Sequence, residues 1–310
     1  MVDSLISQTP KLNDHSSAVK SEWFDYFRLL KPRVMSLVVF SGLIGMAIAP
    51  GSIHFVTGFI AIISIALGAG AAGAINMWYE SDIDALMQRT KNRPIPSGRV
   101  VREEALSLGI IVAGAAVIIM GLLVNIVSAI LLLLTIAFYV FIYTMLLKRR
   151  TSQNIVIGGA AGSLPPVIGW SAVTGSIDFF PILIFTIIFF WTPPHFWALS
   201  LYNHLDYKKA GIPMLPVVAG LRKTVTYILI YAFLLLPISI MPWFFGYLGT
   251  LYLSTAILLG LIFLLRAVQV LKKINKDANT FEQAAKKLFN YSIFYLFILL
   301  LSVYFDSSLI

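Results

Sequence analysis

The sequence predicts an all-α membrane protein with nine transmembrane helices. Of its 310 residues, 59% are hydrophobic and only 12% are charged, whereas roughly a quarter of the residues of a soluble domain are charged. Three long stretches carry no charged residue and a fourth carries only Asp178. Each is about twice as long as the roughly 20 residues that one membrane-spanning helix needs, so we interpret each stretch as a helical hairpin.

Turn-forming residues divide these stretches into spans. Gly51, Asn125, Gly175 and Gly246 stand near the middle of the four hairpins, where such residues favour a reversal of the chain. The apolar stretch before the C-terminus is long enough for one further helix. The nine expected spans lie near residues 34–50, 55–79, 105–124, 126–147, 155–174, 179–202, 224–246, 249–271 and 288–305.

The positions of the Lys and Arg residues predict which loops face the cytoplasm. With nine spans, all 23 Lys and Arg residues lie towards the side of the N-terminus, before the first span, in loops on that side or, for Arg266, near the end of the eighth span. Cytoplasmic loops are enriched in Lys and Arg, so the N-terminus is expected in the cytoplasm and the C-terminus outside. The net charge of +9 then reflects topology, and we expect no nucleic-acid partner.

The start of the chain is polar and includes Asp3 and Asp14, unlike a signal or transit peptide. We expect residues 1–21 to form a disordered cytoplasmic tail and residues 22–310 to form a single transmembrane domain. Cysteine is absent, which excludes disulfides, thiolate metal ligands and a cysteine nucleophile.

The loop after the second span contains the first group of candidate site residues. Asn76, Glu80 and Asp84 are spaced by four residues, so on a helix they share one face. Oxygen ligands of this kind suit Mg²⁺, which binds one or two carboxylates together with substrate phosphates. The alternative is that these acids only mark the point where the helix enters water.

Three cations follow the acids immediately. Arg89, Lys91 and Arg93 could bind a polyanion such as a diphosphate, because Arg makes bidentate contacts with such groups. Taken alone, a cationic loop is more simply a topology signal.

The loop after the sixth span resembles the first loop as a loose repeat. His195 follows two prolines near a helix end, and Tyr202, Asp206 and Lys208 follow at the membrane boundary. Asp206 would supply a second acid facing the same cavity, while His195 could equally be a buried histidine with its hydrogen bonds satisfied. Asn154, at the start of the fifth span, could face the cavity as well.

These motifs resemble those of the intramembrane UbiA-type prenyltransferases, and in particular their haem-modifying branch. The first motif of that superfamily, Asn-x-x-x-Asp-x-x-x-Asp, falls on Asn76, Glu80 and Asp84. The segments similar to the haem-modifying branch are residues 89–94, 148–159, 194–199 and 206–216. Two positions differ from the superfamily: Glu80 replaces an Asp, and Tyr202 stands where relatives carry the first acid of a second motif.

The resemblance implies a bundle of nine helices around a central, lipid-accessible cavity. It implies Mg²⁺ held by Asn76, Glu80 and Asp84, and protohaem IX and farnesyl diphosphate as substrates. It further implies haem O as the product, destined for a terminal oxidase, with a haem A synthase or that oxidase as a possible partner. His195 becomes a candidate contact or axial ligand to haem iron. Asn154, Tyr202 and Lys208 become further substrate-binding candidates, and Asp206 a further catalytic one.

Three alternative functions predict different features of the sequence. A prenyltransferase for a phenolic acid would keep the first motif but would not need the segments around His195 and Asp206. A transporter should place its polar residues near the middle of the bilayer, and a haem-handling partner would need no Mg²⁺. We expect the cytoplasmic membrane of a bacterium rather than the mitochondrial inner membrane, because the N-terminal tail is acidic and not enriched in Arg.

Overall fold

The computed structural model describes residues 22–309, except for the side chain of Arg33. The predicted disordered tail, residues 1–21, lies outside the described residues. Within this part of the chain the regular structure is entirely helical. Its helices are α1 (Trp23–Leu29), α2 (Pro32–Ala47), α3 (Phe55–Tyr79), α4 (Ser81–Leu86), α5 (Arg102–Leu123), α6 (Ile126–Ala137), η1 (Phe138–Leu147), α7 (Asn154–Ser163), α8 (Pro165–Thr174), α9 (Phe179–Tyr202), α10 (His204–Lys209), α11 (Leu215–Val218), α12 (Leu221–Phe244), α13 (Thr250–Lys273) and α14 (Ala278–Ser307).

Eight helical segments between residues 22 and 309 are long and apolar enough to cross a membrane. A ninth is reached if α1 and the apolar part of α2, which meet at an angle of 59°, count as one broken span. The predicted all-α membrane fold is therefore confirmed, and the predicted count of nine spans holds for the described residues if this bent pair is one span.

Two of the expected spans change character within the membrane. The span near residues 126–147 begins as α6 and continues as the π-helix η1. The span near residues 155–174 consists of α7 and α8, which meet at Leu164 and Pro165. Proline fits the first turn of a helix because its missing N–H would have no partner there, and so it starts α8 where α7 ends.

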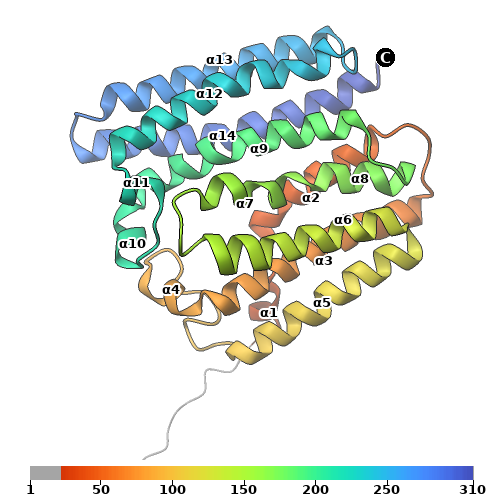
Figure 1. Cartoon of the computed structure of the whole chain (residues 1–310), viewed down its shortest axis with the longest axis horizontal. Helices are drawn as coiled ribbons and strands as arrows, with labels where there is room; N and C mark the ends of the chain where they lie inside the picture. Colours follow the sequence, from red (N-terminus) through yellow and green to blue (C-terminus); the bar gives the residue numbers. More distant parts are fainter. Residues whose placement is uncertain (1–21, 310) are drawn as a thin grey trace, which may run out of the picture.

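The helices stack in layers, with α12 and α13 on one side of the bundle and α5 on the other (Figure 1). One buried core joins α9, α12, α13 and α14, and a second joins α3, α5, α6 and α8. Large apolar side chains such as Ile111 and Leu122 of α5 are exposed on the outside of the bundle. An exposed apolar surface of this kind fits contact with lipid.

Helices α2 and α8 are in direct backbone contact through two glycines. A Cβ atom on Gly45 would lie 2.0 Å from the carbonyl oxygen of Pro166, and one on Gly169 would lie 1.9 Å from that of Gly42. Small residues allow such close approach between membrane helices. This contact holds α2 beside the cavity that carries the candidate site.

The short helices α4, α10 and α11 gather at one end of the bundle, and the C-terminus lies at the opposite end (Figure 1). The residues of the two motif-bearing loops therefore lie at the same end. This is the end to which the charge pattern assigns the cytoplasm.

Candidate active site

A cavity of about 310 Å³ lies between the two cores, at the end of the bundle that carries α4 and α10. Its lining includes Asn76 and Glu80 on one side and His195 of α9 and Leu296 of α14 on the other. The polar residues of the lining come mainly from the ends of helices, whereas the deeper wall is apolar.

The three predicted metal ligands all line this cavity. Helix α3 ends at Tyr79 and α4 starts at Ser81, so the chain is not one continuous helix over the motif. The amide of Glu80 nevertheless donates to the Asn76 carbonyl at 3.0 Å, and the amide of Asp84 donates to that of Glu80 at 2.8 Å. This spacing of hydrogen bonds keeps the three side chains on one face, and each is at most 3% exposed.

Each of these side chains is paired with a different cation. Lys31 Nζ donates to Asn76 Oδ1 at 2.7 Å, and Arg93 donates from one guanidinium nitrogen to Asp84 Oδ2 at 2.6 Å. Lys148 Nζ donates to Glu80 Oε2. Buried carboxylates are costly unless they are paired, and these three cations stabilise the charge of the cluster.

Lys31 and Lys148 were not among the residues that the sequence singled out. Lys31 lies between α1 and α2, and Lys148 directly follows η1. The sequence assigns neither residue to the site: Lys31 counts as a cation that indicates topology, and Lys148 counts as such a cation and as the first residue of a family-like segment. Their pairing needs the fold, which brings them to partners more than forty residues away.

The π-helix η1 presents aromatic rings to the cavity. Tyr139 and Tyr143 line it one turn apart and lead towards Lys148 at the end of the helix. A Cβ atom on Gly158 of α7 would lie 2.1 Å from the ring of Tyr143, so only glycine leaves room for that ring. π-Helices are rare and often mark functional sites.

His195 lies in the opposite wall, held between two aromatic rings. Its ring stacks on Trp191 at 4.3 Å and on Phe289 at 4.7 Å between centroids. Its Nδ1 atom is 2.6 Å from the hydroxyl of Ser292. Among the described residues no hydrogen bond reaches Nε2, which leaves that nitrogen for a group in the cavity that His195 lines.

The remaining predicted residues are divided between the cavity and its surroundings. Arg89 lines the cavity. Lys91 and Lys208 are exposed outside it, and Tyr202 and Asp206 are half-buried outside it. The structure thus brings Tyr207, rather than Asp206, into the lining from α10. The roles assigned to these four residues from the sequence stay predictions.

Asn154 is fully buried beside the cavity rather than in its lining. Its amide nitrogen donates to the carbonyl of Thr151 at 2.7 Å, while its Oδ1 atom has no partner within the described residues. Asn154 therefore fixes the loop that carries Lys148, and its role in substrate binding stays a prediction.

Asp82 shows the contrast between the cavity and its rim. It belongs to the same short helix as Asp84 but is exposed, and Arg149 binds both of its carboxylate oxygens, at 2.7 and 3.0 Å. Partial burial raises the pKa of Asp82, but the hydrogen bonds and positive charge of Arg149, together with backbone hydrogen bonds, outweigh burial and leave that pKa lowered. This pair is a surface clamp between α4 and the end of η1.

The donor set of the cavity fits a hard divalent cation. Glu80 Oε1 is buried and has no hydrogen-bond partner within the described residues, and such an orphaned carboxylate oxygen needs a cation or water. Asn76 and Asp84 add further oxygen atoms, as Mg²⁺ prefers. Residues 22–309 contain no group of three His, Cys, Asp or Glu placed to hold a metal, so any metal here would rely on the Asn76 amide and on ligands from substrate.

Comparisons with known proteins show the family and the fold of the chain. The chain matches the UbiA prenyltransferase family over residues 38–303. It is 55% identical over 285 residues to a protein of Granulibacter bethesdensis named protoheme IX farnesyltransferase, covering 91% of this chain and 90% of that protein.

Two solved structures share the fold at low sequence identity. The structure of a digeranylgeranylglyceryl phosphate synthase aligns with a TM-score of 0.75 and 19% identity, covering 93% of this chain and 99% of that one. A UbiA homologue from Archaeoglobus fulgidus bound to DMAPP and Mg²⁺ aligns with a TM-score of 0.64 and 16% identity, covering 89% of this chain and 99% of that one.

Proposed function

The chain belongs to the UbiA prenyltransferase family, and from this membership we propose that it transfers a farnesyl group from farnesyl diphosphate to the vinyl group of protohaem IX, giving haem O. The family expected from the motifs is thereby confirmed. We infer the substrates from the name of the relative that is 55% identical to this chain over 285 residues. The observation that carries the proposal is one cavity with a cation-lined end and a histidine in the opposite wall.

The polar end of the cavity fits the diphosphate. Each of the three cluster residues accepts a hydrogen bond from one cation, namely Lys31, Arg93 or Lys148. Arg89, four residues before Arg93, also lines the cavity. Charge-assisted hydrogen bonds from such groups stabilise phosphate oxygens as negative charge develops on them. Mg²⁺ held by Asn76, Glu80 and Asp84 would supply further neutralisation of the leaving group when bound.

The chemistry then follows from the donor and acceptor. The bond between C1 of the farnesyl group and the diphosphate oxygen breaks, and the diphosphate leaves with the electron pair. The rings of Tyr139 and Tyr143 face this part of the cavity, and aromatic faces stabilise an adjacent cation. The haem vinyl group attacks C1, and water captures the new cation as a hydroxyl group after loss of a proton.

His195 is proposed to orient the haem. A neutral imidazole binds haem iron, and the contact of Nδ1 with Ser292 leaves Nε2 for that contact. An iron ligand on the wall opposite the cations would turn one edge of the porphyrin towards the diphosphate end.

The deciding experiment uses membranes that contain the full chain. Incubation with protohaem, farnesyl diphosphate and Mg²⁺ should give a haem that elutes later in reversed-phase chromatography, with its mass increased by farnesyl and water. Membranes without the protein provide the control. Unaltered haem together with prenylation of a phenolic acid would overturn the proposed acceptor.

The proposed setting is the cytoplasmic membrane of a bacterium, with the cavity opening on the cytoplasmic side. The apolar helices support an integral membrane protein, and the relative described above is bacterial. Haem O made there would be available to a haem A synthase or a terminal oxidase, either of which could be a protein partner.

A further inference from the structure

A second pocket adjoins the main cavity and is almost wholly apolar. It measures about 70 Å³ and lies between α2, α3, α6, α7 and α8. Met35, Val38, Tyr139 and Gly162 line both spaces, so the small pocket continues the large one. We call it the inner pocket.

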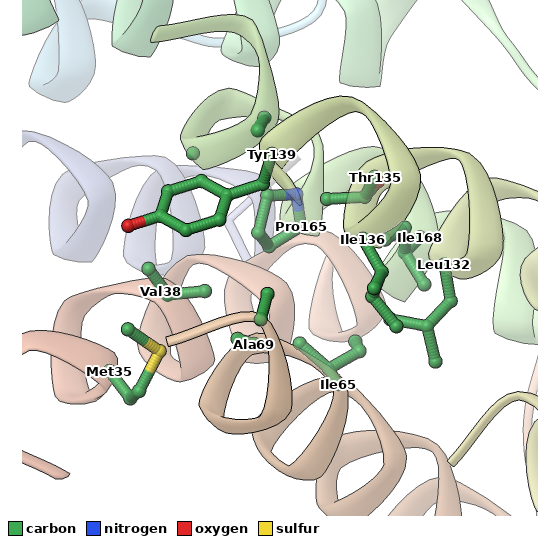
Figure 2. A pocket seen from close by; sticks show the side chains of 13 residues that line it. Met35, Val38, Ile65, Ala69, Leu132, Thr135, Ile136, Tyr139, Pro165 and Ile168 are labelled. Atoms are coloured by element: carbon green, nitrogen blue, oxygen red, sulfur yellow. The ribbon is translucent and has the colours of Figure 1, made fainter. Parts of the chain in front are cut away.

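The end of the inner pocket away from the main cavity is walled by fully buried side chains. Tyr139, Met35 and Val38 lie on the side of the main cavity, and Ile65, Leu132 and Ile168 lie on the far side (Figure 2). These three far residues are 1%, 2% and 0% exposed. At Gly68 of α3, an added Cβ atom would approach Leu132 to 2.8 Å, which shows that α3 and α6 close the end of the pocket tightly.

The chemistry of the lining selects an apolar occupant. The single hydroxyl-bearing aliphatic residue is Thr135, and its hydroxyl already donates to the Leu131 carbonyl at 2.7 Å. No charged residue belongs to the lining. A group with an unsatisfied polar atom would lose hydrogen bonds with water on entering, whereas a hydrocarbon chain would gain from leaving water.

The inner pocket and Lys148 of the polar cluster lie towards opposite ends of the same membrane-spanning segment. A single span, α6 with η1, carries Leu132 at the inner pocket, Tyr139 at its entrance and Lys148 at the polar cluster. At roughly 1.5 Å per residue, the 16 residues from Leu132 to Lys148 span about 24 Å along the helix. This is on the order of the length of extended farnesyl diphosphate.

We propose that the inner pocket receives the distal isoprene unit of the farnesyl chain, and that Leu132 and its neighbours at the closed end set the length of prenyl chain that the enzyme accepts. This inference rests on the proposed function and adds the residues that discriminate between donors. The chain passes between Tyr139 and Val38 with its diphosphate at Lys148 and its tail against Leu132.

Gly162 provides the cleanest test, because it lines both spaces and has room for a side chain. A Cβ atom there would have no heavy atom within 4 Å. Gly162→Leu should therefore fill the passage into the inner pocket without displacing the backbone. Gly114 of α5 is a matched control, because a Cβ atom there also meets nothing within 4 Å and the residue is exposed on the outer face of the bundle.

The experiment compares geranyl, farnesyl and geranylgeranyl diphosphates as donors to protohaem in membranes. In Gly162→Leu, the ratio of kcat/KM for geranyl over farnesyl diphosphate should rise at least about 10-fold, since even one methylene in an apolar pocket changes discrimination by roughly 10- to 200-fold. In Leu132→Ala, use of geranylgeranyl diphosphate relative to farnesyl diphosphate should rise. Gly114→Leu should keep the wild-type ratios.

Several outcomes separate this inference from the proposed function. If wild-type membranes fail to modify haem with any of the three diphosphates, the proposed function fails. If they modify haem but both variants keep the wild-type donor ratios, the inner pocket does not hold the chain. A weaker affinity for haem in Gly162→Leu with unchanged donor ratios would place the porphyrin edge there instead, and would equally overturn the inference. Ratios measured on one membrane sample are independent of the amount of folded protein.

Discussion

Lys148, the first residue after η1, donates a hydrogen bond to Glu80, the residue between α3 and α4, across the polar end of the cavity. The Glu80 side chain is 1% exposed and that of Lys148 is 18% exposed. The second oxygen of Glu80 has no partner within residues 22–309. The pair therefore stabilises a buried carboxylate while leaving one of its oxygens available to a ligand.

Lys148→Met should lower both stability and activity. Removing one partner of a buried ion pair leaves an uncompensated charge and costs about 3–5 kcal/mol. Thermal unfolding in detergent should therefore shift to lower temperature, and the KM for farnesyl diphosphate should rise because a phosphate-binding cation is lost.

The double variant Glu80→Gln with Lys148→Met separates the two effects. It removes both charges, so most of the lost stability should return, but turnover should stay low. Recovery of turnover along with stability would contradict a direct role for this pair in the reaction and would leave it a purely structural contact.

Asp84→Asn should reduce turnover by about 100-fold or more, the size of effect expected when one group that stabilises developing charge is removed. The change keeps the volume of the side chain and leaves an acceptor for Arg93, so the protein should still fold. Turnover measured across a range of Mg²⁺ concentrations is the readout, with thermal unfolding as the test of folding.

Asp82→Asn is the matched control for Asp84→Asn. It removes the same charge from the same short helix, but Asp82 is exposed and binds Arg149 outside the cavity. Surface ion pairs contribute about 0–1 kcal/mol, so activity and its Mg²⁺ dependence should stay close to wild type. Equal losses in the two variants, or full activity of Asp84→Asn at limiting Mg²⁺, would rule out the assignment of Asp84 as a ligand.

The sequence predicted the membrane fold and part of the site because these depend on local patterns. Long apolar stretches define the spans, and the four-residue spacing of Asn76, Glu80 and Asp84 places them on one face even though the helix breaks at Glu80. Lys31 and Lys148 could not be found in this way, since their partners are remote in sequence.

Other features depend on packing that no local pattern records. The position of the Tyr143 ring depends on the space that Gly158 leaves for it. The inner pocket depends on α2, α3, α6, α7 and α8 meeting near Tyr139. For Asp206, the sequence pattern predicted a residue that does not line the cavity. It lies in a segment similar to the family, yet the turn into α10 directs Tyr207 rather than Asp206 into the cavity lining.

The N-terminus is predicted inside and the C-terminus outside, because all 23 cations lie on one side of a chain with an odd number of spans. A periplasm-active reporter such as alkaline phosphatase should be active when fused at Gly51 and inactive when fused after Arg102. A cytoplasm-active reporter provides the control and should show the reverse. Activity of one reporter at both positions would contradict the nine-span topology.

His195→Ala should weaken binding of protohaem far more than binding of a non-hydrolysable farnesyl diphosphate analogue. Its imidazole can ligate iron through Nε2, while the diphosphate is expected among the cations on the other side of the cavity. The haem absorption spectrum reports the ligand directly, so the variant should lose the spectral shift seen on binding to the wild-type protein. Metal-free protoporphyrin should bind both proteins equally.

Ser292→Ala tests whether the orientation of His195 matters. It removes the hydroxyl beside Nδ1 but keeps the backbone carbonyl that accepts from Trp191, so the stack of rings should persist. Loss of a group that orients a metal ligand typically weakens affinity by about 10- to 100-fold, so haem affinity should fall between those of wild type and His195→Ala. His204→Ala is the control, since His204 lies outside the cavity lining and contacts the Leu201 carbonyl. If metal-free protoporphyrin binding falls as much as haem binding in His195→Ala, the histidine shapes the wall of the cavity and does not ligate iron.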